Sequence, residues 1–122
     1  MLAIFGGVGV GKTQIATTIV AKHLQVEEHA VVTYHRPSEL VGAIARGEDI
    51  IADVLVVDGL TAADIKNPHL TEYLIERYND LESTILVFDL PGDRMSEVPL
   101  QIRSMIQETG AIINCVWPSL RG

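Results

Sequence analysis

The chain alternates between short apolar runs and longer segments in which apolar residues recur at helical spacing. A short apolar run bounded by turn residues is typical of a buried strand, whereas helical spacing indicates a helix with one buried face. This alternation predicts a doubly wound α/β domain with a parallel sheet. The predicted strands cover residues 2–5, 30–34, 54–58, 84–89 and 111–116. The predicted helices cover residues 13–24, 37–45 and 68–80, with one helix or two short ones in 96–108.

Glycine dominates the connection between the first predicted strand and the first predicted helix. Residues 6–13 read Gly-Gly-Val-Gly-Val-Gly-Lys-Thr, which fits the G-x-x-x-x-G-K-[ST] pattern of a phosphate-binding loop. In such a loop, backbone N–H groups and the helix N-terminus surround the phosphates, Lys12 reaches the β- and γ-phosphates, and Thr13 offers its hydroxyl to Mg²⁺. We therefore predict that ATP and Mg²⁺ bind here. The predicted nucleotide contacts are Gly6, Gly7, Val8, Gly9, Val10, Gly11, Lys12, Thr13 and Gln14.

Two predicted strands end in an acidic residue, Asp58 and Asp89. Because the carboxyl ends of parallel strands form the ligand crevice, both carboxylates are expected to lie toward the phosphates. An apolar strand that ends in Asp after a phosphate loop is the Walker B arrangement, whose carboxylate holds Mg²⁺ through water. Lys12, Asp58 and Asp89 are therefore candidate catalytic residues, and Thr13 and Asp58 are candidate metal ligands. The alternative for each acid is that it caps the turn after its strand.

Length and charge narrow the function classes. The 122 residues predict a single domain over 1–122, and no apolar run reaches the roughly 18 residues that a membrane span needs. No basic stretch precedes the first apolar run, so we expect no signal peptide and a cytoplasmic location. The net charge of −7 argues against a broad nucleic-acid surface, although a small basic patch would be compatible with it. Cys115 lies in an apolar run and is interpreted as a core residue.

The order and spacing of these segments resemble the AAA+ core of the bacterial helicase loaders, the DnaC, DnaI and IstB group, and of their phage-encoded relatives. The resemblance rests on residues 9–19, 32–41, 52–60, 73–90, 101–106 and 112–121. It implies a three-layer P-loop NTPase fold with a five-stranded parallel sheet in the order 5-1-4-3-2. It also implies a nucleoside triphosphate as ligand and a replication protein, either a helicase or a full-length loader, as partner.

The same resemblance says less about DNA. Loaders have two helices between the second strand and Walker B that contribute to single-stranded DNA contact, whereas residues 35–53 leave room for one. The bases in this segment are Arg36 and Arg46. We interpret them as a solvated turn residue and a charge at a helix C-terminus rather than as DNA contacts.

Several positions depart from the loader pattern where hydrolysis is concerned. Gly59 stands where loaders have the Glu that orients the attacking water, and Asp89 stands where they have the sensor Asn. Gln101 and Met105 replace two loader arginines, and Arg103 lies between them. A missing arginine finger alone lowers the rate by roughly 10³- to 10⁵-fold. We therefore predict weak or absent hydrolysis, and expect Gly59→Glu, on a backbone already shaped for glutamate, to raise turnover when a partner supplies an arginine.

The residues leave three functions open. The first is an ATP-binding domain that hydrolyses little and acts through protein partners, as a phage replication accessory or a regulator of a full-length loader. The second is an active ATPase that loads helicase or acts on DNA, with Asp89 as the base. The third is a small-molecule kinase, for which Arg94 and Arg103 are the available lid arginines. The two missing loader arginines are those expected to complete the nucleotide site of a neighbouring subunit. We therefore expect a monomer or weak dimer in isolation and an ATP-dependent complex with a partner.

Overall fold

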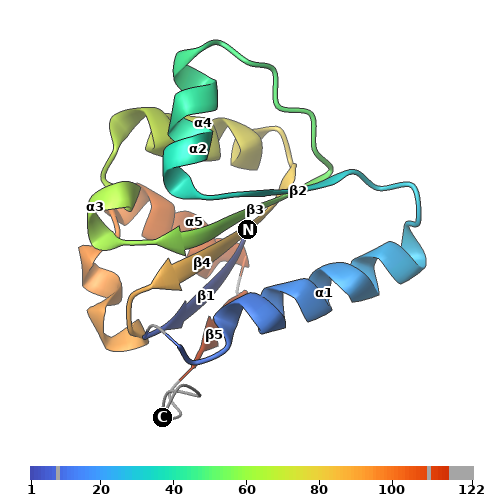
Figure 1. The fold of residues 1–122 in the computed structure, drawn as a ribbon. Helices are drawn as coiled ribbons and strands as arrows, with labels where there is room; N and C mark the ends of the chain where they lie inside the picture. The colour runs from blue at the N-terminus through green and yellow to red at the C-terminus, as the bar shows by residue number, and fades with distance from the viewer. Residues whose placement is uncertain (8, 110, 116–122) are drawn as a thin grey trace.

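The computed structural model describes residues 1–7, 9–109 and 111–115, and shows a five-stranded sheet with helices on both faces (Figure 1). The strands are β1 (Leu2–Gly6), β2 (Val32–His35), β3 (Val54–Leu60), β4 (Ser83–Asp89) and β5 (Ile112–Asn114). The helices are α1 (Lys12–Val26), α2 (Pro37–Ala45), α3 (Ala62–Ile65), α4 (Pro68–Asn79) and α5 (Leu100–Thr109), with a 3₁₀ helix, η1 (Gly92–Glu97), before α5. None of the helices in the described residues is long and apolar enough to cross a membrane.

The strand order confirms the order implied by the loader resemblance. The sheet runs β2-β3-β4-β1-β5 with parallel pairing between neighbouring strands, which is the predicted 5-1-4-3-2 read from the other edge. Val87 on β4 lies opposite Ile4 on β1, while Ile85 on β4 lies opposite Val56 on β3. The strand that ends in Asp89 therefore separates the phosphate-loop strand from the Walker B strand.

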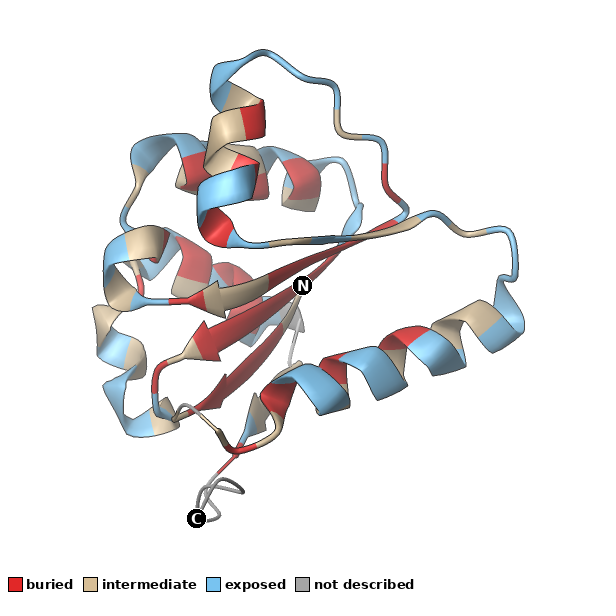
Figure 2. Cartoon of the chain, viewed as in Figure 1, coloured by how far each residue is buried: buried red, intermediate tan, exposed pale blue. Residues whose placement is uncertain are grey.

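Two apolar clusters hold the three layers together. Alternating residues of β3 show the division: Val56 packs in the cluster that includes α1, and Leu55 packs in the cluster that includes α2, α4 and α5. The central strands β1, β3 and β4 are therefore buried on both faces, as Figure 2 shows, whereas β2, β5 and the outer sides of the helices are partly or fully exposed. Phe5 of β1 and Phe88 of β4 stack with ring centroids 4.6 Å apart. This packing sets the register that brings the strand ends together at one edge.

The predicted elements are present, with differences at their ends. β2 begins at Val32 rather than at residue 30, and β3 continues past residue 58 to Leu60. The segment 96–108 holds the last two residues of η1 and nearly all of α5, which agrees with the one-helix alternative. Helix α3 was not predicted because its four residues are too few to show helical spacing. The capping box formed by Thr61 and Asp64 was its available sequence signal. Residue 116 of the fifth predicted strand lies outside the described residues.

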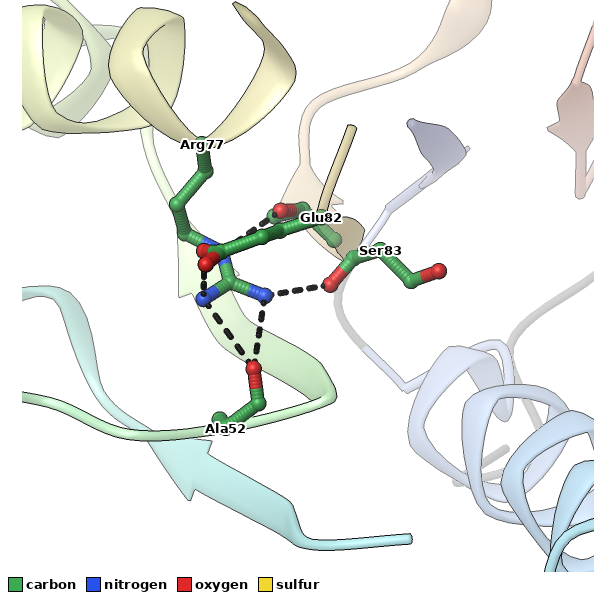
Figure 3. Close-up of polar contacts among 5 residues, drawn as sticks. Ala52, Arg77, Glu82 and Ser83 are labelled. Atoms are coloured by element: carbon green, nitrogen blue, oxygen red, sulfur yellow. Dashed lines mark hydrogen bonds and ion pairs between the residues drawn. The ribbon is translucent and has the colours of Figure 1, made fainter. Parts of the chain in front are cut away.

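Arg77 of α4 packs against the amino ends of β3 and β4 and is only 3% exposed (Figure 3). Its Nε donates to Thr84 Oγ1 at 3.0 Å, and its Nη2 donates to the Ser83 carbonyl at 2.7 Å. Both terminal nitrogens lie 3.4 Å from the Ala52 carbonyl, and Nη1 donates to Glu82 Oε2 at 2.9 Å. One guanidinium thus joins α4 to the starts of two strands.

Candidate nucleotide-binding site

The phosphate loop runs from the end of β1 to the start of α1, and its glycines adopt a backbone that other residues rarely adopt. Gly9 and Gly11 both have φ near +86°, in the left-handed region. Gly11 is the N-cap of α1, so the turn delivers the chain directly into the helix. The first turn of α1 contains no acidic residue to oppose the partial positive charge of its N-terminus. Val8, one of the predicted contacts, lies outside the described residues.

Lys12 is held across this loop and is only 5% exposed. Its Nζ donates to the Gly7 carbonyl at 2.6 Å and forms an ion pair with Asp89 Oδ1 at 3.1 Å. A buried ammonium group needs partners for its charge, and here one of them is a carboxylate with 33% of its side chain exposed.

Thr13 and Asp58 meet at the carboxyl end of β3. The Thr13 hydroxyl donates to Asp58 and lies 3.1 Å from Oδ2 and 3.3 Å from Oδ1. Mg²⁺ is usually held by one or two protein oxygens, with phosphate oxygens and water completing its shell. This pair fits such an ion. No group of three or more His, Cys, Asp or Glu side chains suited to a metal occurs among the described residues.

Asp58 and Asp89 lie on neighbouring strands but face different partners. Asp58 follows Val56 on the face covered by α1, which is why it reaches Thr13. Asp89 lies opposite Gly6 at the end of β1, which places its carboxylate beside Lys12. The structure therefore brings the predicted catalytic residues and metal ligands to one edge of the sheet.

Gly59 departs from the expectation made for it. Its φ is +83°, and the β3–β4 register shifts between Asp58 and Leu60, which marks a bulge. The expectation that this backbone is already shaped for glutamate was therefore wrong, because a residue with a side chain is strained in the left-handed region. Space is not the obstacle: a Cβ at Gly59 would lie 3.6 Å from Arg36 Nη1 and 3.7 Å from Asp89 Oδ2, which are ordinary contacts.

The positions of the missing arginines differ from one another in exposure. Gln101 is exposed on α5, whereas Met105 is 6% exposed and packs in the core. Arg103 is partly buried, and its Nε is buried without a hydrogen-bond partner among the described residues. Arg94 on η1 forms an ion pair with Glu97, three residues later in the chain. Its guanidinium is therefore occupied by this pair rather than extended over the phosphate loop.

An open cleft of about 450 Å³ lies beside the phosphate loop, between α1 and β5. Gln14, Ile15 and Ile113 are among the residues that line it. The predicted contact Gln14 is exposed on α1, and Val10 also faces the cleft. The cleft offers a mainly apolar surface next to the place where phosphates would bind.

Cys115 lies under the same loop and is buried. Burial raises the pKa of its thiol, and the charge of Lys12 acts in the opposite direction. A cysteine with a raised pKa carries little thiolate at neutral pH and reacts slowly. The structure therefore places Cys115 as a packing residue, as the sequence indicated.

Sequence reasoning missed the position of Arg36. This residue directly follows β2 and is the N-cap of α2, and its side chain is exposed, as expected for a solvated residue. Its guanidinium nevertheless lies next to Gly59. The signal that could have found it is the rule applied to Asp58 and Asp89, since Arg36 also follows the carboxyl end of a parallel strand.

Comparison with known proteins places the fold. No protein-family model matches the chain, and no curated protein matches its sequence. Solved structures of DnaA do match. Domain III of the Thermotoga maritima replication initiation protein DnaA is 24% identical with a TM-score of 0.71, over 96% of this chain and 55% of that one. The chain has the fold of DnaA domain III.

Two further DnaA structures agree with this assignment. AMPPCP-bound DnaA from Aquifex aeolicus is 16% identical with a TM-score of 0.64, over 88% of this chain and 38% of that one. The replication initiator DnaA bound to AMPPCP and single-stranded DNA is 19% identical with a TM-score of 0.66, over 96% of this chain and 40% of that one. The chain thus spans from about two fifths to just over half of these proteins, and at such identities the likeness establishes the fold.

Proposed function

We propose that this chain binds ATP with Mg²⁺ at the phosphate loop, hydrolyses it slowly, and acts through a protein partner in DNA replication. The observation that carries the proposal is the buried Lys12 ammonium, which is aimed across a left-handed glycine loop and paired with a partly exposed carboxylate. An ammonium group in that position has protein partners that phosphate oxygens can replace. The N-terminus of α1 adds partial positive charge to the same place.

The remaining predicted residues have distinct tasks in this proposal. Thr13 and Asp58 hold Mg²⁺, which would neutralise phosphate charge and orient the terminal phosphate. Backbone N–H groups of the loop contact the phosphates, and the cleft lined by Gln14, Ile15 and Ile113 provides a surface for the base. The structural similarity to DnaA supports this choice of ligand, because two of the similar DnaA structures contain AMPPCP.

Slow hydrolysis follows from what surrounds the site of water attack. Gly59 has no side chain with which to orient water, and Asp89 is engaged by Lys12. The alternative, an active ATPase with Asp89 as its base, requires that phosphate binding free this carboxylate. Turnover measured with and without Asp89 separates the two: robust activity that Asp89→Ala abolishes would favour the alternative.

The proposed partner is a replication protein, either a helicase or a full-length loader. The net charge of −7 favours a basic protein surface over nucleic acid, and encounter with such a surface is sensitive to salt. Single-stranded DNA is a second candidate, because one structure with the same fold holds it. In isolation the chain is expected to be a monomer or weak dimer. Sedimentation with ATP and Mg²⁺ tests this expectation, and a closed hexamer or a filament of this chain alone would contradict it.

Calorimetric titration with AMPPCP and Mg²⁺ tests nucleotide binding directly. Lys12→Ala removes a buried charge-assisted contact to phosphate, so affinity should fall at least about tenfold. Arg46→Ala is the matched control, because Arg46 is an exposed base at the far end of α2 that pairs with Glu48. Affinity that is the same in Lys12→Ala and in the unaltered chain would overturn the proposal.

A further inference from the structure

The bulge at Gly59 leaves a side-chain position open between a cation and a carboxylate. A Cβ built there would be 3.6 Å from Arg36 Nη1 and 3.7 Å from Asp89 Oδ2. Glycine supplies no atom at this point, so both charged groups border the space that a side chain would fill. Arg36 and Asp89 come from the ends of β2 and β4, and Gly59 lies on β3 between them.

This position is connected to the phosphate loop through Asp89. One oxygen of the Asp89 carboxylate contacts Lys12 Nζ at 3.1 Å, and the other lies against the open position at Gly59. The terminal phosphate that Lys12 contacts would therefore lie one carboxylate away from the Arg36 guanidinium. The Arg36 side chain is exposed, so it can change rotamer without disturbing the core.

The charges at this edge are unevenly satisfied. Lys12 is paired with Asp89, and Asp58 accepts from Thr13. The Arg36 side chain has no hydrogen bond or ion pair to another described residue, although acids lie close by. Its planar guanidinium is suited to bidentate phosphate contact, which a lysine cannot reproduce. The unpaired Arg36 guanidinium is therefore available to contact a phosphate bound at this site.

We propose that Arg36 binds the terminal phosphate of the bound nucleotide from within the same chain, and thereby makes the site selective for a triphosphate over a diphosphate. This inference rests on the proposed nucleotide binding. It also gives the glycine a role: glutamate at position 59 would place a carboxylate beside Arg36 and compete with the phosphate for it.

Calorimetric titrations of the full chain with AMPPCP and with ADP, each with Mg²⁺, test this role. Arg36→Ala should lower AMPPCP affinity about tenfold and change ADP affinity less than about twofold, because ADP lacks the phosphate that Arg36 contacts. Arg36→Lys should retain part of the preference, since it keeps the charge but loses the fork. Arg46→Ala, at the other end of the same helix, should leave both affinities unchanged.

The outcomes separate this inference from nucleotide binding itself. An equal loss for AMPPCP and ADP in Arg36→Ala would overturn it, because Arg36 would then act on the arrangement of Asp89 and Lys12. Unchanged affinity for both would overturn it as well. In either case a loss of both affinities in Lys12→Ala would leave the proposed function standing. If the unaltered chain binds neither nucleotide, both proposals fail together.

Discussion

Lys12 and Arg77 are the two buried charged residues of the described part of the chain, with 5% and 3% exposure. Lys12 lies at the carboxyl end of β4, beside Asp89, and Arg77 lies at the amino end of the same strand. The Arg77 guanidinium has acceptors on every side, including the backbone carbonyls of Ala52 and Ser83 (Figure 3). The Lys12 ammonium has one backbone carbonyl and the partly exposed carboxylate of Asp89.

This difference distinguishes Arg77, whose role is structural, from Lys12, the cation proposed to bind phosphate. Backbone acceptors at strand starts cannot leave without disrupting the sheet, so the Arg77 network is closed to ligands. The partly exposed Asp89 carboxylate can be hydrated when it leaves, and we propose that phosphate oxygens then replace it as the partner of the buried Lys12 ammonium. We therefore assign Arg77 to the stability of the fold, whereas Lys12 is the cation proposed to contact phosphate.

The largest effect is expected from removing the closed network. Arg77→Met leaves the Ala52 and Ser83 carbonyls without their donor and should lower the free energy of unfolding by about 3–5 kcal/mol. Urea denaturation measures this loss. Lys12→Ala should lose less, because Asp89 can turn to water. Arg94→Ala breaks an exposed pair and should cost at most about 1 kcal/mol. A loss for Arg77→Met no larger than that for Arg94→Ala would break the comparison.

A smaller loss of stability is expected at the phosphate edge from Gly59. Gly59→Ala forces a side chain into φ of +83° and should lower the free energy of unfolding by about 1–2 kcal/mol. Gly59→Asn should lose less, since asparagine tolerates this conformation. Gly42→Ala, inside α2, is the matched control and should be neutral or slightly stabilising. Equal stability of the Gly59→Ala and Gly42→Ala variants would show that the bulge carries no strain.

The smallest expected effect sharpens the account of Lys12. Asp89→Asn removes the carboxylate that competes with phosphate for the ammonium, so affinity for AMPPCP with Mg²⁺ should rise about threefold to tenfold. Titration calorimetry provides the measurement. A fall in affinity would mean that Asp89 helps to hold the ligand rather than competing with it.

Many of the secondary-structure elements could be predicted because they depend on local sequence patterns. The apolar runs of β3 and β4, the helical spacing of α1 and α4, and the glycine loop each depend on residues close in sequence. The strand order needed more than these patterns and came from the resemblance to the loaders, which placed β4 between β1 and β3. Short elements such as α3 escaped prediction because four residues carry no period.

The sequence by itself determined the element types, the phosphate-binding loop, and the acids that follow two strands. Only the tertiary structure decided which acid meets which partner: Asp89 pairs with Lys12, and Asp58 with Thr13. It also decided that Gly59 is left-handed and that Arg36 lies beside it. The physical reason is that these contacts join residues far apart in the chain. They depend on strand register and on a bulge, which are set by packing of the whole sheet rather than by neighbouring residues.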